Sequence, residues 1–224
     1  MGISCSLAEK GTSETMRISG WKSGIATAAA IMGIGLILSA TATPPRPQAT
    51  QTAAQEIVLS VDPGQSKVHW IVDSTLHTVH GTFAMKGGSL HLDSASGKAS
   101  GEIVVLARSG ESGNGSRDEK MHKEVLESGK FPDVIFRPTQ VEGKVLNSGS
   151  SDVKVQGTFV LHGSSHEITV PVHAELSGEN WKGSGKFDVP YIQWGLKNPS
   201  NFLLKVQPVV NVELEIAGSL KIQK

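Results

Sequence analysis

Histidine is the residue whose number and spacing in this chain most readily suggest metal chemistry. The chain contains eight histidines, and two close pairs stand out, His77 with His80 and His162 with His166. Residues three apart on a strand point to opposite faces, so His77 and His80 should not converge on one ion. His162 and His166 flank a predicted turn and could meet, but no H-E-x-x-H motif is present. We predict solvated turn histidines and no metal site, with a histidine-dependent metal-binding module or enzyme as the alternative.

A second polar group, Arg117, Asp118 and His122, lies at the start of a predicted helix. One interpretation is a polar gate around the head group of a ligand. The other is an aspartate that favours the helix dipole, beside an arginine and a histidine at the surface. The chain has no G-x-S-x-G motif, and the glycines from Gly113 lack the third glycine of a dinucleotide fingerprint. The sequence therefore predicts no catalytic residue and no cofactor.

Composition excludes several other classes of function. The formal net charge is zero, from 21 basic and 21 acidic residues, so no broad electrostatic footprint for nucleic acid is present. The single cysteine, Cys5, precedes a predicted cleavage point. Its position excludes a disulfide framework, a thiol nucleophile and a cysteine-based metal site in the mature chain.

Residues 1–42 are predicted to be a secretory signal peptide. Arg17 and Lys22 precede or flank a largely apolar run over residues 24–40, and Ala40-Thr41-Ala42 supplies a cleavage pattern of small residues. Residues 1–15 form an extension that fits this pattern poorly. The alternative is an uncleaved membrane anchor, for which the run is short and weakly hydrophobic. Residues 43–55 are predicted to be a disordered linker, and the domain that follows is expected to be periplasmic, secreted or membrane-anchored.

Residues 56–222 are predicted to form an all-β domain, because apolar and polar side chains alternate along nine or ten short segments. Such alternation favours antiparallel strands with one wet face, and closure into a barrel would remove the exposed edges. We predict an antiparallel lipocalin-like barrel of eight or more strands, with a β-sandwich as the alternative. Gly87-Gly88 is predicted to be a turn and residues 181–194 a strand interrupted by Pro190. Pro171 and Pro190 should mark bulges or a local opening.

One short helix is predicted near the middle of the chain, within residues 115–138. Ser116 and Glu119 fit a capping box, and Gly129 fits the residue that follows a helix C-terminus. Met121, Val125 and Leu126 form a short apolar stripe. A single helix inserted in a β chain suggests a lid over the sheet.

Several motifs carry a resemblance to a known family. They are Arg117-Asp118, Met121-His122, Gly129-Lys130-Phe131-Pro132 followed by Val134-Ile135-Phe136, and Val79-His80-Gly81-Thr82-Phe83. This pattern resembles the signature of YceI-like polyisoprenoid-binding proteins and extends over about residues 57–220. It departs from many relatives at Ser165-His166-Glu167 and at Pro190-Tyr191, which affects ligand identity more than fold.

The resemblance implies a lipocalin-like barrel that holds a long apolar chain in its lumen: a polyisoprenoid, an isoprenoid quinone or another lipid. A ligand-free structural or partner-binding domain is the alternative, and a homodimer is left open. The aromatic residues on the strands, the inward aliphatic positions, the helix stripe and the polar group give the candidate ligand contacts, which are Trp70, Phe83, Val105, Arg117, Asp118, Met121, His122, Val125, Leu126, Phe131, Phe136, Phe159, Val170, Phe187, Trp194, Val212 and Leu214.

The export signal generates a first prediction. Signal peptidase should cleave after Ala42, so the mature protein should begin near Thr43. N-terminal sequencing of protein from a secreting host checks this. An intact N-terminus on protein that stays in the membrane fraction would instead support an anchor.

Overall fold

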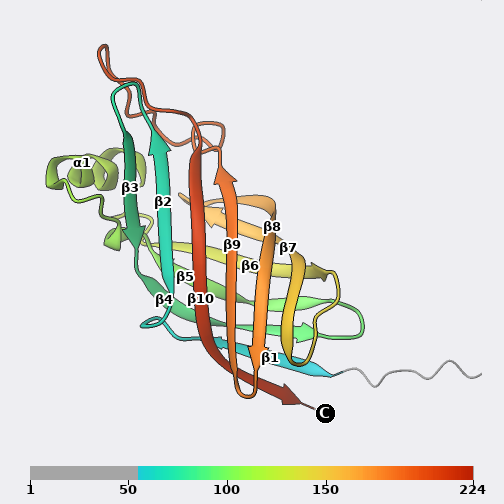
Figure 1. Ribbon diagram of the computed structural model, residues 1–224. Helices are drawn as coiled ribbons and strands as arrows, with labels where there is room; N and C mark the ends of the chain where they lie inside the picture. The colour runs from blue at the N-terminus through green and yellow to red at the C-terminus, as the bar shows by residue number, and fades with distance from the viewer. Residues whose placement is uncertain (1–54, 224) are drawn as a thin grey trace, which may run out of the picture. The chain divides into compact units, whose positions relative to one another are not determined.

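The computed structural model describes residues 55–223 (Figure 1). The predicted signal peptide and nearly all of the predicted linker lie outside these residues. Ten strands dominate the described part, and no helix in it is long and apolar enough to cross a membrane. The strands are β1 (Glu56–Val61), β2 (Lys67–Asp73), β3 (Thr78–Phe83), β4 (Met85–Asp93), β5 (Ala99–Leu106), β6 (Asp133–Glu142), β7 (Gly149–Leu161), β8 (Ser164–Ser177), β9 (Asn180–Val189) and β10 (Val210–Gln223).

The strands close into an antiparallel barrel because β10 changes partner along its length. Its first part, Asn211–Glu215, pairs with β2, and its last part, Gly218–Gln223, pairs with β1. β1 and β2 thus share one place in the ring, and β3 and β4 share the next, since β2 pairs with β3 and β1 with β4. With β5 to β10 this gives a closed ring of eight places. The predicted all-β barrel is confirmed.

One end of the barrel is filled by side chains. A buried apolar cluster there includes Ile57, Leu92, Leu176, Trp181 and Leu220, each less than a tenth exposed. The Trp181 indole N–H donates to the Ser60 carbonyl at 3.2 Å, which ties β9 to β1. Full burial of each such large apolar side chain contributes about 1.5–3 kcal/mol. We call this end, where the cluster leaves only a cavity of about 140 Å³, the filled base.

The wall of the barrel opens where Pro171 lies. β8 pairs with β9 only from Val172 to Ser177, whereas β8 pairs with β7 along its whole length. Because proline has no N–H to donate, the β8–β9 ladder ends beside it. The predicted local opening is confirmed at Pro171. Pro190, in contrast, follows the end of β9, so the predicted strand to residue 194 is wrong: residues 191–195 form turns.

The prediction of a turn at Gly87-Gly88 is also wrong. Both glycines lie inside β4, next to a bulge between Met85 and Gly87. Gly88 has a φ of +147°, and a Cβ there would come within 2.1 Å of the Glu102 carbonyl oxygen. The pair therefore permits a close approach of β4 to β5.

The helical segment comprises η1 (Ala107–Ser109), α1 (Gly115–Lys120) and a single π-helical turn, η2 (Met121–Val125). Asn114, and not Ser116, caps α1: its side chain accepts from the Arg117 N–H at 3.0 Å. At the other end Glu127, and not Gly129, adopts the left-handed conformation, with a φ of 44°. Both predicted helix ends were therefore misplaced by two residues.

Candidate functional site

The end of the barrel opposite the filled base encloses a cavity of about 450 Å³. Its walls come from the inward faces of the strands, and its mouth is bounded by α1, η2 and the segment that joins β9 to β10. The side chains that face it are almost all aliphatic or aromatic. Its few polar neighbours, among them Asn114, Arg117 and Lys120, come from the helical segment and the loops.

Most of the predicted ligand contacts line this cavity. The alternation of apolar residues on β2, β3, β5, β6, β7, β9 and β10 brings them to one lumen, and the helix stripe lies with them. The residues that line it are Trp70, Phe83, Val105, Arg117, Met121, Val125, Leu126, Phe136, Phe159, Phe187, Val212 and Leu214.

The lumen is divided, whereas a single space was predicted. A second cavity of about 140 Å³ lies toward the filled base, and Val170 lines this one instead. Phe136, Phe159 and Phe187 border both cavities and form a partition between them. The Phe159 and Phe187 rings meet edge to face, with centroids 5.7 Å apart. Aromatic rings thus set the depth to which an occupant of the larger cavity can reach.

Arg117 and Asp118 brace the loop before α1. The Arg117 Nε donates to Ser112 Oγ at 2.7 Å, and its Nη2 donates to the Ser112 carbonyl at 2.8 Å. Ser112 Oγ in turn donates to the Asp118 carboxylate. Arg117 also lines the cavity, but Asp118 does not. Of this pair, the structure places only Arg117 where it could meet a ligand.

His122 has a similar bracing position. Its Nδ1 lies 3.1 Å from Ser128 Oγ and its Nε2 lies 2.8 Å from the Gly110 carbonyl oxygen. The imidazole therefore joins the loops before and after the helical segment and does not line the cavity. A Cβ on Gly110 would come within 2.4 Å of the Phe83 ring, so this loop packs directly on the cavity wall.

Two further predicted contacts, Phe131 and Trp194, line neither cavity. They pack against the turn histidines that were predicted to be solvated. The Phe131 ring lies 4.4 Å from His162, and the Trp194 ring stacks on His166 at 4.1 Å. His162 also contacts Glu127 at 2.6 Å, with its side chain only 22% exposed. The solvated interpretation is wrong for both histidines. Among residues 55–223 no three His, Cys, Asp or Glu side chains gather in a metal-binding group.

The sequence analysis missed the segment between β9 and β10. Tyr191 and Leu196 are buried against the cavity, and Pro199, Asn201 and Leu204 line its mouth. Tyr191 lay in the range wrongly predicted as a strand, and the residues after 194 carry no periodic pattern, since the segment is neither helix nor strand. Its proximity to the helix depends on tertiary contacts alone.

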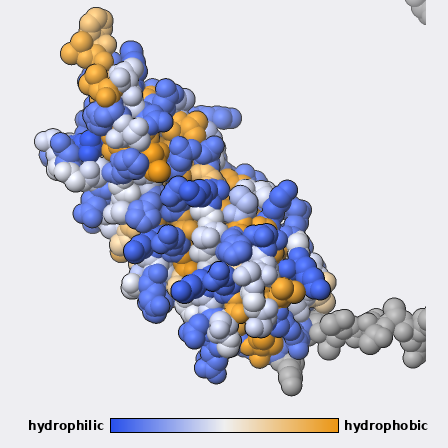
Figure 2. Space-filling model, viewed as in Figure 1, coloured by the Kyte–Doolittle hydropathy of each residue, from blue (hydrophilic) through white to orange (hydrophobic). Residues whose placement is uncertain are grey.

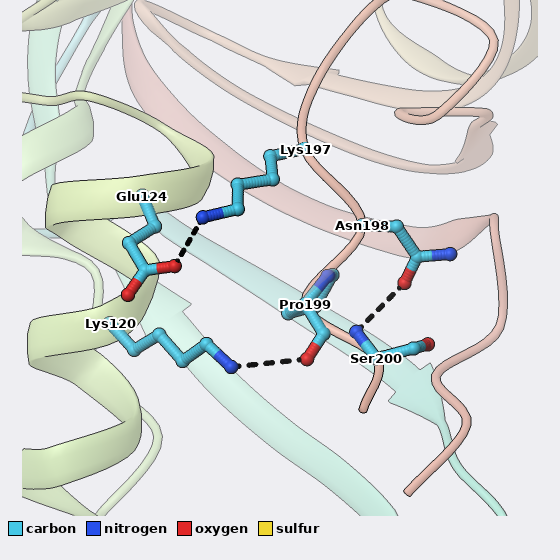
Figure 3. Close-up of polar contacts among 6 residues, drawn as sticks. All are labelled: Lys120, Glu124, Lys197, Asn198, Pro199 and Ser200. Atoms are coloured by element: carbon cyan, nitrogen blue, oxygen red, sulfur yellow. Dashed lines mark hydrogen bonds and ion pairs between the residues drawn. The ribbon is translucent and has the colours of Figure 1, made fainter. Parts of the chain in front are cut away.

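Two polar contacts join this segment to the helix across the mouth (Figure 3). Lys197 Nζ lies 2.6 Å from the Glu124 carboxylate, and Lys120 Nζ donates to the Pro199 carbonyl at 3.2 Å. The hydrogen bond from Lys197 lowers the pKa of the Glu124 carboxyl below its ordinary value. Exposed ion pairs of this kind contribute little to stability. They therefore add little to the buried apolar cluster in which Tyr191 and Leu196 pack with Val125 and Leu126 of the helical segment.

Comparison with known proteins identifies the family. A family model described as "YceI-like domain" matches residues 59–218. The chain belongs to the YceI-like family. No curated protein matches it.

Two solved structures share the fold of this chain. One is Burkholderia cenocepacia BcnA, with a TM-score of 0.58 and 15% identity over 70% of this chain and 99% of that chain. Another is a polyisoprenoid binding domain from Saccharophagus degradans implicated in plant cell wall breakdown. It has a TM-score of 0.54 and 14% identity over 73% of this chain and 98% of that one. At these identities the likeness is one of fold.

The contacts of the two turn histidines generate a prediction for this YceI-like domain. Replacing both His162 and His166 by alanine should lower the free energy of unfolding by about 1–3 kcal/mol, because two aromatic contacts and the hydrogen bond between His162 and Glu127 are lost. Thermal or urea unfolding checks this, with His80→Ala, an exposed histidine, as the control. Equal stability of the double variant and the control would contradict the assigned packing.

Tyr191, the only tyrosine in the chain, generates a second prediction. Its hydroxyl is buried without a hydrogen-bond partner in the described structure, and burial raises its pKa above the ordinary 10.0. The folded state therefore disfavours the tyrosinate, and the free energy of unfolding should fall as pH rises above about 10. Tyrosinate absorbance should appear at higher pH in folded than in denatured protein.

The variant Tyr191→Phe separates burial from hydrogen bonding. It should change stability at neutral pH by about 1 kcal/mol or less, because no hydrogen bond is lost, and it should remove this residue's part of the alkaline decline. A larger loss at neutral pH would show that the hydroxyl has a partner.

Proposed function

We propose that this protein holds a long apolar ligand, a polyisoprenoid, an isoprenoid quinone or another lipid, in the barrel lumen and performs no catalysis. The observation that carries this proposal is the apolar cavity of about 450 Å³ with a mouth at one end of the barrel. Small-molecule sites span about 300–1,000 Å³ and are lined mostly by apolar side chains. The polyisoprenoid binding domain from Saccharophagus degradans, which shares the fold, supports the same ligand class.

Energetics favour an occupied lumen over a ligand-free structural domain. Protein interiors are close-packed and contain few voids larger than a water molecule. An empty apolar cavity forfeits dispersion contacts along its whole wall. Burial of each CH₂ contributes about 0.8 kcal/mol, so one five-carbon isoprenoid unit contributes up to roughly 4 kcal/mol before ordering costs. Two or three such units would bind tightly with few polar contacts.

The proposal includes export. The predicted signal peptide would deliver the barrel to the periplasm or the medium, where a carrier would keep a water-insoluble chain out of water. Cell fractionation tests this part separately from ligand binding.

Phe159 provides the sharpest test of ligand binding, because its ring belongs to the partition. Phe159→Trp places a larger ring at the partition, reduces the free volume of the larger cavity and should shorten the longest chain that co-purifies. Phe159→Ala should join the two cavities and admit a longer one. Lipid extraction with mass spectrometry measures both, and circular dichroism reports whether the barrel remains folded.

Leu146→Trp serves as the matched control, since residue 146 is exposed and lines neither cavity. It should leave the chain length unchanged. Lipid-free protein from its own host, together with unchanged titrations of added polyprenols for both Phe159 variants, would reject the carrier function.

A further inference from the structure

Large apolar side chains are exposed at the rim of the cavity mouth. The described residues contain five large hydrophobic side chains with substantial exposure, and three of them lie in the two loops at the mouth end: Leu76 at 72%, Phe202 at 94% and Leu203 at 80%. Figure 2 shows apolar surface concentrated at this projecting tip, above the ends of β2 and β3. We call Leu76, Phe202 and Leu203 the apolar tip.

Hydrogen bonds close the loop that carries Phe202 and Leu203 into a defined turn. The Asn201 side chain accepts from the N–H groups of Leu203 and Leu204 at 2.9 and 2.7 Å, and the Asn201 N–H donates to the Leu204 carbonyl at 2.9 Å. Phe202 and Leu203 therefore stand at the apex of a closed turn. Leu204, the next residue, lines the cavity.

The second loop is fastened to the first. The Thr75 N–H donates to the Lys205 carbonyl at 2.9 Å, and the Lys205 N–H donates to Thr75 Oγ1 at 3.3 Å. An isolated bridge pairs Ser74 with Val206. Leu76 is thereby held beside the turn, so the three side chains form one surface at the rim of the mouth.

Charges of both signs lie near the apolar tip, since Asp73 adjoins the loop of Leu76 and Glu124 pairs with Lys197, but the longer of the two loops is itself basic. Residues 190–209 contain Lys197 and Lys205 and no acidic residue, and Lys120 lies at the mouth. Interfacial membrane segments combine apolar side chains with lysine or arginine in this way. Each basic residue near an anionic leaflet contributes to attraction, and the attraction is screened by salt.

We propose that the apolar tip inserts into an anionic lipid surface and sets the mouth of the cavity against it. This inference rests on the proposed function, because a water-insoluble chain must enter from a lipid phase. Insertion would bury Leu76, Phe202 and Leu203, and the lysines would face lipid head groups. The same head groups would compete for Lys120 and Lys197, whose contacts with Pro199 and Glu124 span the mouth. A lipid could then pass into the lumen without crossing water.

The test places an environment-sensitive label at the tip of the full chain. Phe202→Cys in a Cys5→Ser background carries a nitrobenzoxadiazole group, and Leu146→Cys in the same background is the control at the opposite end of the barrel. Phosphatidylcholine vesicles, with and without phosphatidylglycerol, are added at low and high salt. A blue shift and gain of emission from position 202, absent from position 146 and strongest with phosphatidylglycerol at low salt, is expected.

A second experiment measures lipid transfer by a triple variant that combines Leu76→Ser, Phe202→Ser and Leu203→Ser. Removing three inserted side chains should slow transfer of a fluorescent polyprenol between vesicles by at least about tenfold. Leu146→Ser with Ile222→Ser, which removes two exposed apolar side chains elsewhere, should transfer at the native rate. Equilibrium binding of a short, water-soluble prenol should be equal in all variants.

The arms distinguish the two proposals. No response of the label at position 202 to either vesicle, or native transfer by the triple variant, overturns the membrane-contact inference. If the label responds only to another protein, the tip is a protein-docking surface and the inference is likewise wrong. If the native protein does not bind the short prenol, the proposed function is overturned instead.

Discussion

The structure depends on closing a ring of backbone hydrogen bonds around a space that side chains do not fill. Closure requires β10 to pair with β2 near the mouth and with β1 near the base. Because inward and outward side chains alternate along the strands outside the bulges of β4 and β6, a closed ring directs the inward apolar residues toward one axis. At the base these residues meet in a buried cluster, whereas near the mouth they leave a cavity. The cavity is thus a direct consequence of the hydrogen-bond pattern.

Stability and access are located at opposite ends of this barrel. The base is closed by large buried side chains and by the Trp181 contact with β1. The mouth is closed by a short helical segment and an irregular loop, joined by the exposed contacts of Lys197 and Lys120. Between them, the Phe136, Phe159 and Phe187 side chains limit depth. The two ends thus differ in how they are closed, by strands and large side chains at the base and by a helical segment and a loop that pack through Tyr191 and Leu196 at the mouth.

Alternation in the sequence predicted antiparallel strands and most of their inward residues, and the family resemblance favoured a barrel over the alternative β-sandwich. Alternation could not predict the partition, because Phe159 and Val170 share the same inward character and differ only in depth along the axis. Asn114 was missed as the helix cap because Ser116 offered an equally acceptable pattern. Arg117, Asp118 and His122 looked like a ligand gate, but their contacts with Ser112, Ser128 and Gly110 depend on how the loops fold back. Tyr191 was placed in a strand that ends at Val189, and Leu196 belongs to a loop without a periodic pattern.

The central claim is that the lumen, and not the outer surface, receives the apolar chain. Nuclear Overhauser effects between an unlabelled polyprenol and isotope-labelled methyl groups test it directly. The account predicts effects at Val105 and Leu214, which line the larger cavity, and none at Ile222, which is exposed on β10. Effects confined to Ile222 and other outer methyl groups, with Val105 and Leu214 silent at saturating ligand, would contradict it.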